Sequence, residues 1–184
     1  MKTKDLTKLS ICIALLCVSS YLSFPLPFSP VMVTSQTIVI NVIALILTPK
    51  QALLTVSLYL VIGLLGLPVF SGGASGIAKL LSPTGGFILG FLLAAPLMSL
   101  AKGRELTLRQ SLLVTIGVGM PIIYVFGTLW MSYIGQMEVA SALKLAVIPF
   151  VLGDLVKCVI GSWIAIKLKP VMGYPSLLTS LNHE

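Results

Sequence analysis

Charged residues are scarce in this sequence of 184 residues. Asp, Glu, Lys and Arg make up 9% of it, against about 25% in a typical soluble domain. Hydrophobic residues make up 57%, and the mean hydropathy is +1.08. This composition is typical of an integral membrane protein, and the length predicts one membrane domain over residues 1–184 without a separate soluble catalytic module.

Several residue patterns that catalysis needs are also missing. Gly-Lys-Ser/Thr does not occur, so there is no Walker A loop to hold a nucleotide for hydrolysis. The single histidine, His183, stands next to the last residue, and Asp154 is the one acid deep within an apolar run. The sequence therefore excludes a buried histidine base, a paired-aspartate intramembrane protease and a Gly-x-Ser-x-Gly hydrolase. The residues present therefore favour a binding function over a catalytic one.

Metal and nucleic-acid sites are not indicated either. Cys12, Cys17 and Cys158 lie within apolar runs and lack metal-ligand spacing. We interpret them as small buried side chains and expect no metal or other cofactor. The formal net charge is +7, but the basic residues stand at the ends of apolar runs rather than in one patch. We therefore expect a lipid bilayer, not nucleic acid, around this chain.

The apolar runs predict an all-α polytopic membrane protein with six transmembrane helices. A membrane-spanning helix needs about 20 residues. The second run is short, and Pro49 separates it from the third, so we expect it to be tilted, broken or sheltered by its neighbours. No cleavage site ends the first run, which we interpret as the first helix. The runs cover about residues 8–24, 36–48, 51–67, 84–101, 110–132 and 142–168.

Basic residues predict the orientation. Nine of them fall on one side of a six-span topology, while Lys79 and Lys144 fall on the other and Lys157 is internal. By the positive-inside rule both termini are cytoplasmic. The nine are Lys2, Lys4, Lys8, Lys50, Lys102, Arg104, Arg109, Lys167 and Lys169.

Two outer connections are unusual. Residues 24–35 contain three prolines, which prevent a helix, and lead into Thr34-Ser35-Gln36-Thr37. This polar cluster either caps the second helix or binds a polar ligand. Residues 66–87, between the third and fourth predicted helices, hold six glycines and two prolines interleaved with apolar side chains. We expect residues 67–82 to form an ordered lid rather than a flexible surface loop.

Asp154 and Lys157 stand three residues apart in a very apolar stretch and so share one helix face. Near the middle of a bilayer each charge costs roughly 2.5–3.5 kcal/mol or more. We therefore predict that the pair faces a protein interior, a cavity or a ligand. A mutual ion pair that only orients the helix is the alternative.

These segments resemble the BioY family, the biotin-binding (S) components of energy-coupling-factor (ECF) vitamin transporters. The resemblance spans about residues 8–168. Its matching features are the Thr34–Thr37 cluster, Tyr59, the block from Gly63 to Phe70, Gly72-Gly73, Gly76, the block from Pro83 to Phe91, and Pro149-Phe150-Val-Leu-Gly-Asp154-Leu-Val-Lys157.

The resemblance implies a six-helix fold that holds biotin near the outer face of a bacterial cell membrane. It also implies a membrane coupling subunit and two cytoplasmic ABC-type ATPases, which agrees with the missing Walker A loop. Family members dock through small residues on the first helix, here Ser10 and Ala14, although Val18 is larger than that pattern expects.

Biotin suits the charged pair, because its ureido ring offers two N–H donors and one C=O acceptor. Asp154 can accept an N–H, and Lys157 can donate to the ureido oxygen. We expect apolar walls at Tyr59, Phe70 and Phe87, a contact from Lys79 to the valerate, and further contacts from Thr34, Gln36, Gly73 and Thr84. The alternatives are an S component for another small vitamin, and a membrane-embedded enzyme that uses Asp154 and Lys157 as acid and base.

Overall fold

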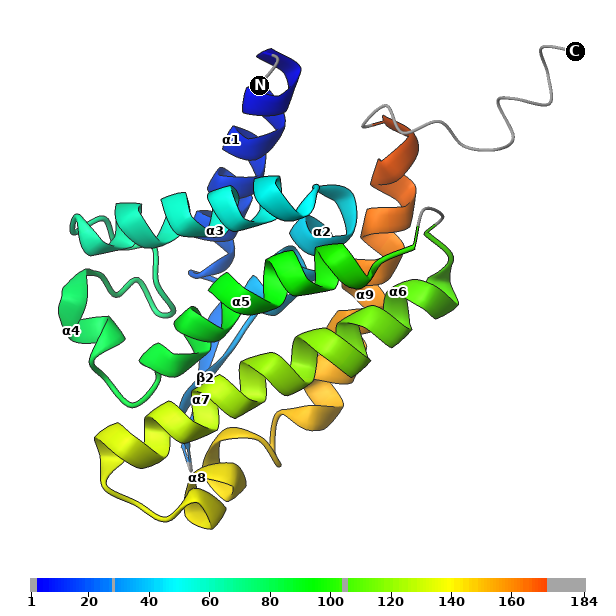
Figure 1. Ribbon diagram of the computed structural model, residues 1–184. Coiled ribbons are helices and arrows are strands. Elements are labelled where there is room, and N and C mark those ends of the chain that lie inside the picture. Colours follow the sequence, from blue (N-terminus) through cyan, green and yellow to red (C-terminus); the bar gives the residue numbers. More distant parts are fainter. Residues whose placement is uncertain (1–2, 28, 104–105, 172–184) are drawn as a thin grey trace, which may run out of the picture.

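The computed structural model describes residues 3–27, 29–103 and 106–171, and most of these residues are helical (Figure 1). α5 packs between α3 and α7, and α2 packs against both α9 and α5. Lys2 and Arg104, which belong to the predicted basic side, lie outside the described residues. The helices are α1 Thr3–Ser19, α2 Gln36–Ile46, α3 Pro49–Leu64, α4 Gly76–Leu80, α5 Gly85–Ala101, α6 Leu108–Val114, the π-helical segment η1 Thr115–Gly119, α7 Met120–Gly135, α8 Val139–Ala146 and α9 Val151–Val171.

A β-hairpin corrects the all-α prediction. The proline-rich connection forms strands β1 (Ser23–Leu26) and β2 (Ser29–Thr34), which pair antiparallel with Ser23 opposite Thr34. Proline is compatible with the extended backbone of a short edge strand. It prevents a helix because it has no backbone N–H to donate. The hairpin carries Thr34 to the start of α2.

α2 is short because the next helix, α3, begins soon after it at Pro49 with a well-defined N-terminus. Thr48 and Gln51 form a capping box: the Thr48 hydroxyl accepts from the Gln51 backbone N–H (3.4 Å), and the Gln51 side chain accepts from the Thr48 N–H (3.1 Å). Pro49 occupies the first helical position of α3. α2 has 11 residues, and the consecutive stretch from Ile40 to Ile46 is buried, so neighbouring helices shelter it.

The last predicted span is not one helix. Residues 147–150 separate α8 from α9. Pro149 has no N–H to donate and disfavours helical backbone at Ile148, which explains the break. Asp154 consequently lies in the first turn of α9, where the helix dipole favours a negative charge.

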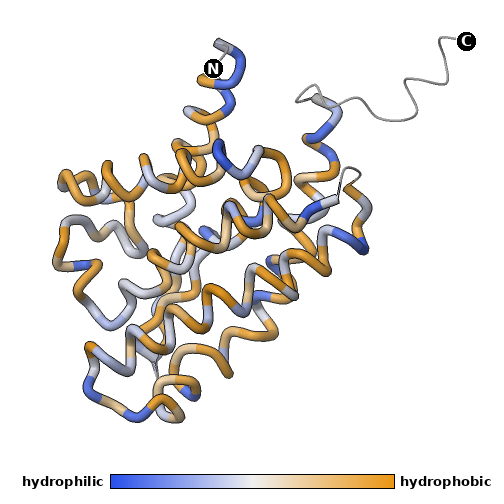
Figure 2. The backbone as a smooth tube through the Cα atoms, in the orientation of Figure 1, coloured by the Kyte–Doolittle hydropathy of each residue, from blue (hydrophilic) through white to orange (hydrophobic). Residues whose placement is uncertain are grey.

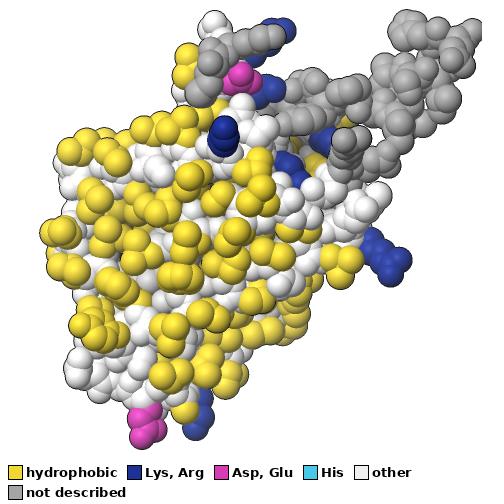
Figure 3. Space-filling view, in the orientation of Figure 1, with side chains coloured by type: hydrophobic (Ala, Val, Ile, Leu, Met, Phe, Trp, Pro, Cys, Tyr) yellow, Lys and Arg dark blue, Asp and Glu magenta, His cyan; other side chains and the backbone are white. Residues whose placement is uncertain are grey.

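Hydrophobic residues run along most of the helices (Figure 2), and apolar side chains cover much of the face seen in Figure 3. Leu100 is 67% exposed, Leu113 64% and Trp163 58%. By length and composition, the continuous helix from Leu108 to Gly135 is the one among the described residues that could cross a membrane unaided, and α2, α3 and α5 are apolar but shorter. The exposed apolar surface is what lipid tails would cover.

The ends of the bundle differ in charge. The start of α1, the end of α9, the start of α3 and the connection from α5 to the start of α6 lie toward the top and right of Figure 1, whereas α8 lies at the bottom. Lys50, Lys102 and Arg109 belong to the first group of segments, while Glu138 is the N-cap residue of α8 and Lys144 lies in its last turn. This separation matches the predicted basic asymmetry. The six-span topology with both termini inside stays a prediction.

That topology predicts the labelling of single cysteines in a chain whose three native cysteines are replaced by alanine. A membrane-impermeant maleimide should label Ser75→Cys in intact cells and Gly103→Cys only after permeabilisation, because the two residues stand at opposite ends of the bundle. Labelling of Gly103→Cys in intact cells would overturn the orientation.

Candidate functional site

A cavity of about 540 Å³, counting the space open at its mouth, lies between β2, α5, α7 and the break that separates α8 from α9. Of the elements that line it, β2 and the end of α8 lie away from the start of α1 and the end of α9 (Figure 1). Ligand pockets typically have mostly apolar walls with a few polar groups, and this lining has that composition. Its lining residues are Val31, Met32, Thr34, Thr37, Ser71, Thr84, Phe87, Ile88, Phe91, Ile123, Tyr124, Ala146, Phe150, Asp154 and Lys157.

The charged pair is the polar centre of this cavity. Lys157 Nζ lies 2.8 Å from Asp154 Oδ1, and the Tyr124 hydroxyl donates to Asp154 Oδ2 at 2.6 Å. The carboxylate thus has one donor on each oxygen, while each oxygen keeps a further lone pair. Asp154 is only 8% exposed. Both members of the pair lie in the cavity wall, with room for a ligand to reach them.

A second, smaller cavity of about 260 Å³ adjoins the first, because Thr37, Ile123, Tyr124 and Asp154 line both. Thr37 Oγ1 is buried without a hydrogen-bond partner among the described residues. Buried polar atoms are normally satisfied. Thr37 is therefore a ready hydrogen-bonding group for a bound molecule or water.

Five residues predicted from the sequence meet in the cavity wall. Thr34 comes from β2, Thr84 and Phe87 from the start of α5, and Asp154 and Lys157 from α9. Gly127 on α7 makes room for the Phe87 ring, since a Cβ there would lie 2.4 Å from it. The structure brings these residues together from distant parts of the chain, and their roles toward a ligand remain predictions.

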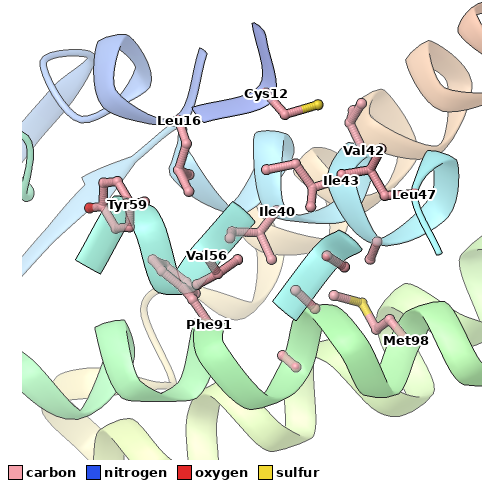
Figure 4. Close-up of a cluster of buried hydrophobic side chains, with 14 of the residues drawn as sticks. Cys12, Leu16, Ile40, Val42, Ile43, Leu47, Val56, Tyr59, Phe91 and Met98 are labelled. Carbon is pink, nitrogen blue, oxygen red and sulfur yellow. The ribbon is translucent and has the colours of Figure 1, made fainter. Parts of the chain in front are cut away.

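Gln36, Tyr59 and Phe70 do not line the cavity. Gln36 Nε2 donates to the Tyr59 hydroxyl (2.6 Å), which donates to the backbone oxygen of Val69 (3.0 Å). The Tyr59 and Phe70 rings meet edge to face with centroids 5.6 Å apart. Figure 4 shows Tyr59 within the buried apolar cluster. In this structure the three hold the connection after α3 against the core, and a contact from them to a ligand stays a prediction.

Two other predicted residues also lie outside the cavity wall. Gly73 has a positive φ of 73° in the glycine-rich connection, which explains glycine there. Lys79 is on the short helix α4, where partial burial lowers the pKa of its ammonium group. Ser71 is the one residue of segment 67–82 in the lining of the main cavity, so the predicted lid reaches the site through that residue.

Thr37 and Tyr124 were not among the predicted site residues. Thr37 belongs to the polar cluster at the start of α2, and the members of this cluster make different contacts. Ser35 Oγ donates to Ser19 O at 3.0 Å, whereas Thr34 and Thr37 line the cavity. Tyr124 stands in a long apolar run, where its sequence position carries no signal that it meets Asp154.

The predicted docking residues lie on the surface. Ser10, Ala14 and Val18 recur every four residues on α1, and all three are exposed. The Ser10 hydroxyl is satisfied by Leu6 O at 3.0 Å. This face is free of packing within the described chain, and docking through it remains a prediction.

The chain is similar to known proteins in sequence and in fold. The BioY family model matches residues 1–174. The chain belongs to the BioY family. Among curated relatives, it is 37% identical to the biotin transporter BioY2 of Lactococcus lactis subsp. cremoris, with 86% of each chain covered, and 33% identical to a probable biotin transporter BioY of Pyrococcus horikoshii, with 92% and 98% covered.

The fold has a close counterpart among solved structures. A structure of the S-component for biotin from an ECF-type ABC transporter matches with a TM-score of 0.84 over 92% of this chain and 95% of that one, at 24% identity. BioY membership identifies a membrane protein of a transport family, and neither this family nor its structural neighbour is an enzyme.

Proposed function

We propose that this BioY-family chain is the biotin-binding S component of an ECF-type importer in a bacterial cell membrane. The observation that carries the proposal is the Asp154–Lys157 pair in the wall of an otherwise largely apolar cavity. An ionised carboxylate only accepts hydrogen bonds, and an ammonium only donates them. A ureido ring, with two N–H donors and one C=O acceptor, complements this pair.

The rest of the cavity suits the remainder of biotin. Phe87, Phe91 and Phe150 offer apolar surface to the fused rings and the aliphatic chain. Thr34, Ser71 and Thr84 supply hydroxyl groups for additional hydrogen bonds. Lys79 stands outside this lining, so we do not assign it to the valerate. The curated relatives named as biotin transporters support this ligand.

Two measurements test the proposal. Mass spectrometry of the purified chain should detect biotin, released unchanged. Calorimetric titration of ligand-free protein should give tight 1:1 binding of biotin and no heat with thiamine or riboflavin, which lack a saturated ureido ring. Tight binding of another vitamin instead of biotin would reassign the ligand, and a chemically altered product would favour an enzyme.

Transport then needs partners, because the sequence has no phosphate-binding loop. We propose a membrane coupling subunit and two cytoplasmic ABC-type ATPases, with biotin captured at the outer face. The charge separation between the ends of the bundle supports this direction. ATP hydrolysis by the purified chain alone would contradict it.

The exposed α1 face is our candidate for docking on the coupling subunit. Ala14→Trp should reduce co-purification with that subunit at least tenfold while leaving biotin affinity unchanged, because a bulky side chain prevents close helix approach. Leu15→Trp is the matched control at a neighbouring exposed site. Equal co-purification of the Ala14→Trp and wild-type chains would remove this face from the interface.

A further inference from the structure

A third hollow, separate from the two adjoining cavities of the candidate site, lies on the surface of the long helix from α6 to α7, on the basic side of the bundle. Its lining is Arg109, Leu112, Leu113, Ile116 and Gly117, and it encloses about 520 Å³, including space open to the surroundings. These residues recur at helical spacing and share one face. The hollow ends at Gly117, where a Cβ would meet nothing within 4 Å.

Charge divides this groove into a polar end and an apolar end. Arg109 stands at one end, and aliphatic side chains and a glycine form the rest. The helix from Leu108 to Gly135 contains no acidic residue, and among the described residues no ion pair involves Arg109. A guanidinium group in this position suits a phosphate, which it can bind through two parallel hydrogen bonds.

The length of the groove fits one leaflet of a bilayer. Arg109 and Gly117 are eight residues apart, which corresponds to about 12 Å along a helix. Half of a hydrocarbon core of about 30 Å is about 15 Å. With Arg109 at the headgroup level, the apolar part of the groove runs alongside an acyl chain for most of a leaflet.

We propose that this groove binds an anionic phospholipid, with its phosphate on Arg109 and one acyl chain along Leu112, Leu113 and Ile116 to Gly117. A partner helix is a poorer occupant, because an apolar helix face would leave the guanidinium without an anion. The inference goes beyond the biotin site and does not depend on it.

Native mass spectrometry of the full-length chain in detergent tests the lipid site. Titration with phosphatidylglycerol should give one saturable adduct, and phosphatidylcholine should bind at least fivefold more weakly. Arg109→Gln should weaken the phosphatidylglycerol adduct roughly fivefold, as expected for one basic residue at a lipid surface. Gly117→Leu, which fills the groove but keeps the charge, should weaken it by a similar factor.

Lys50→Gln is the matched control, since Lys50 is exposed on the same side but lies outside the groove. It should change lipid binding less than twofold. If the Lys50 and Arg109 variants lose equal affinity for phosphatidylglycerol, the effect reflects general surface charge. If Gly117→Leu binds the lipid as the wild type does, the acyl chain does not lie in the groove. Competition by inorganic phosphate as strong as by the lipid would make the site a simple anion site. Unchanged melting temperatures exclude misfolding as the cause.

Discussion

Replacing Asp154 by asparagine is expected to weaken biotin binding by roughly 30-fold to several thousand-fold. Removing one partner of a buried, hydrogen-bonded charge pair costs roughly 2–5 kcal/mol, at about 1.4 kcal/mol per decade of affinity. Both oxygens of Asp154 accept from donors, Lys157 Nζ on one and the Tyr124 hydroxyl on the other. An asparagine keeps one acceptor oxygen and turns an NH₂ donor toward the other donor. The ureido N–H then also loses its anionic acceptor.

Two further variants separate binding from folding. Glu138→Gln makes the same chemical change at an exposed acid near α8 and should change biotin affinity less than twofold. Asp154→Asn combined with Lys157→Met leaves no unpaired charge, so it should restore thermal stability but not biotin binding. Calorimetric titration of monodisperse protein gives the affinities. Near-wild-type affinity in a well-folded Asp154→Asn chain would make the pair structural and remove the main support for the ligand.

Replacing Gly86 by leucine should prevent α5 and α7 from packing closely. A Cβ at Gly86 would lie 2.2 Å from Trp130 Cβ and 2.4 Å from the Phe126 backbone oxygen. A backbone atom cannot turn aside as a flexible side chain can, so the helices must separate. Overpacking typically costs 1–3 kcal/mol and occasionally more. We expect the apparent melting temperature to fall by several degrees and the monodisperse fraction to shrink.

Gly86→Leu should also displace residues of the binding site. Trp130 Nε1 donates to Leu80 O at 3.0 Å and to Ser82 O at 3.2 Å, so α7 anchors the connection that precedes Thr84 and Phe87. Biotin affinity should therefore fall along with stability. Gly153→Leu is the control, because a Cβ there meets nothing within 4 Å and leucine favours a helix over glycine by about 1 kcal/mol. Equal melting temperatures for Gly86→Leu and the wild type would show that α5 and α7 can repack.

Much of the architecture followed from the sequence because helix formation here depends on local features. The apolar runs located five of the six predicted helices to within five residues at each end, while the last run divides into α8 and α9. Pro49 marked the boundary between α2 and α3. The spacing of Asp154 and Lys157 placed both on one helix face, and they form the observed ion pair. Local prolines were harder to interpret: they signalled irregular backbone at residues 24–35, but strand pairing between β1 and β2 depends on contacts across the chain.

The sequence by itself determined the membrane character, the major helical segments and the charged pair, because composition, periodicity and i, i+3 spacing act within single segments. Tertiary structure decided which polar side chains meet that pair. Tyr124 reaches Asp154 across 30 positions, while Gln36 and Tyr59, equally polar in sequence, bond to each other in the core. The physical reason is that helical spacing fixes a residue's place only within its own helix. The rotation of each helix about its axis is set by packing against its neighbours, as where Gly86 lets α5 approach Trp130 on α7.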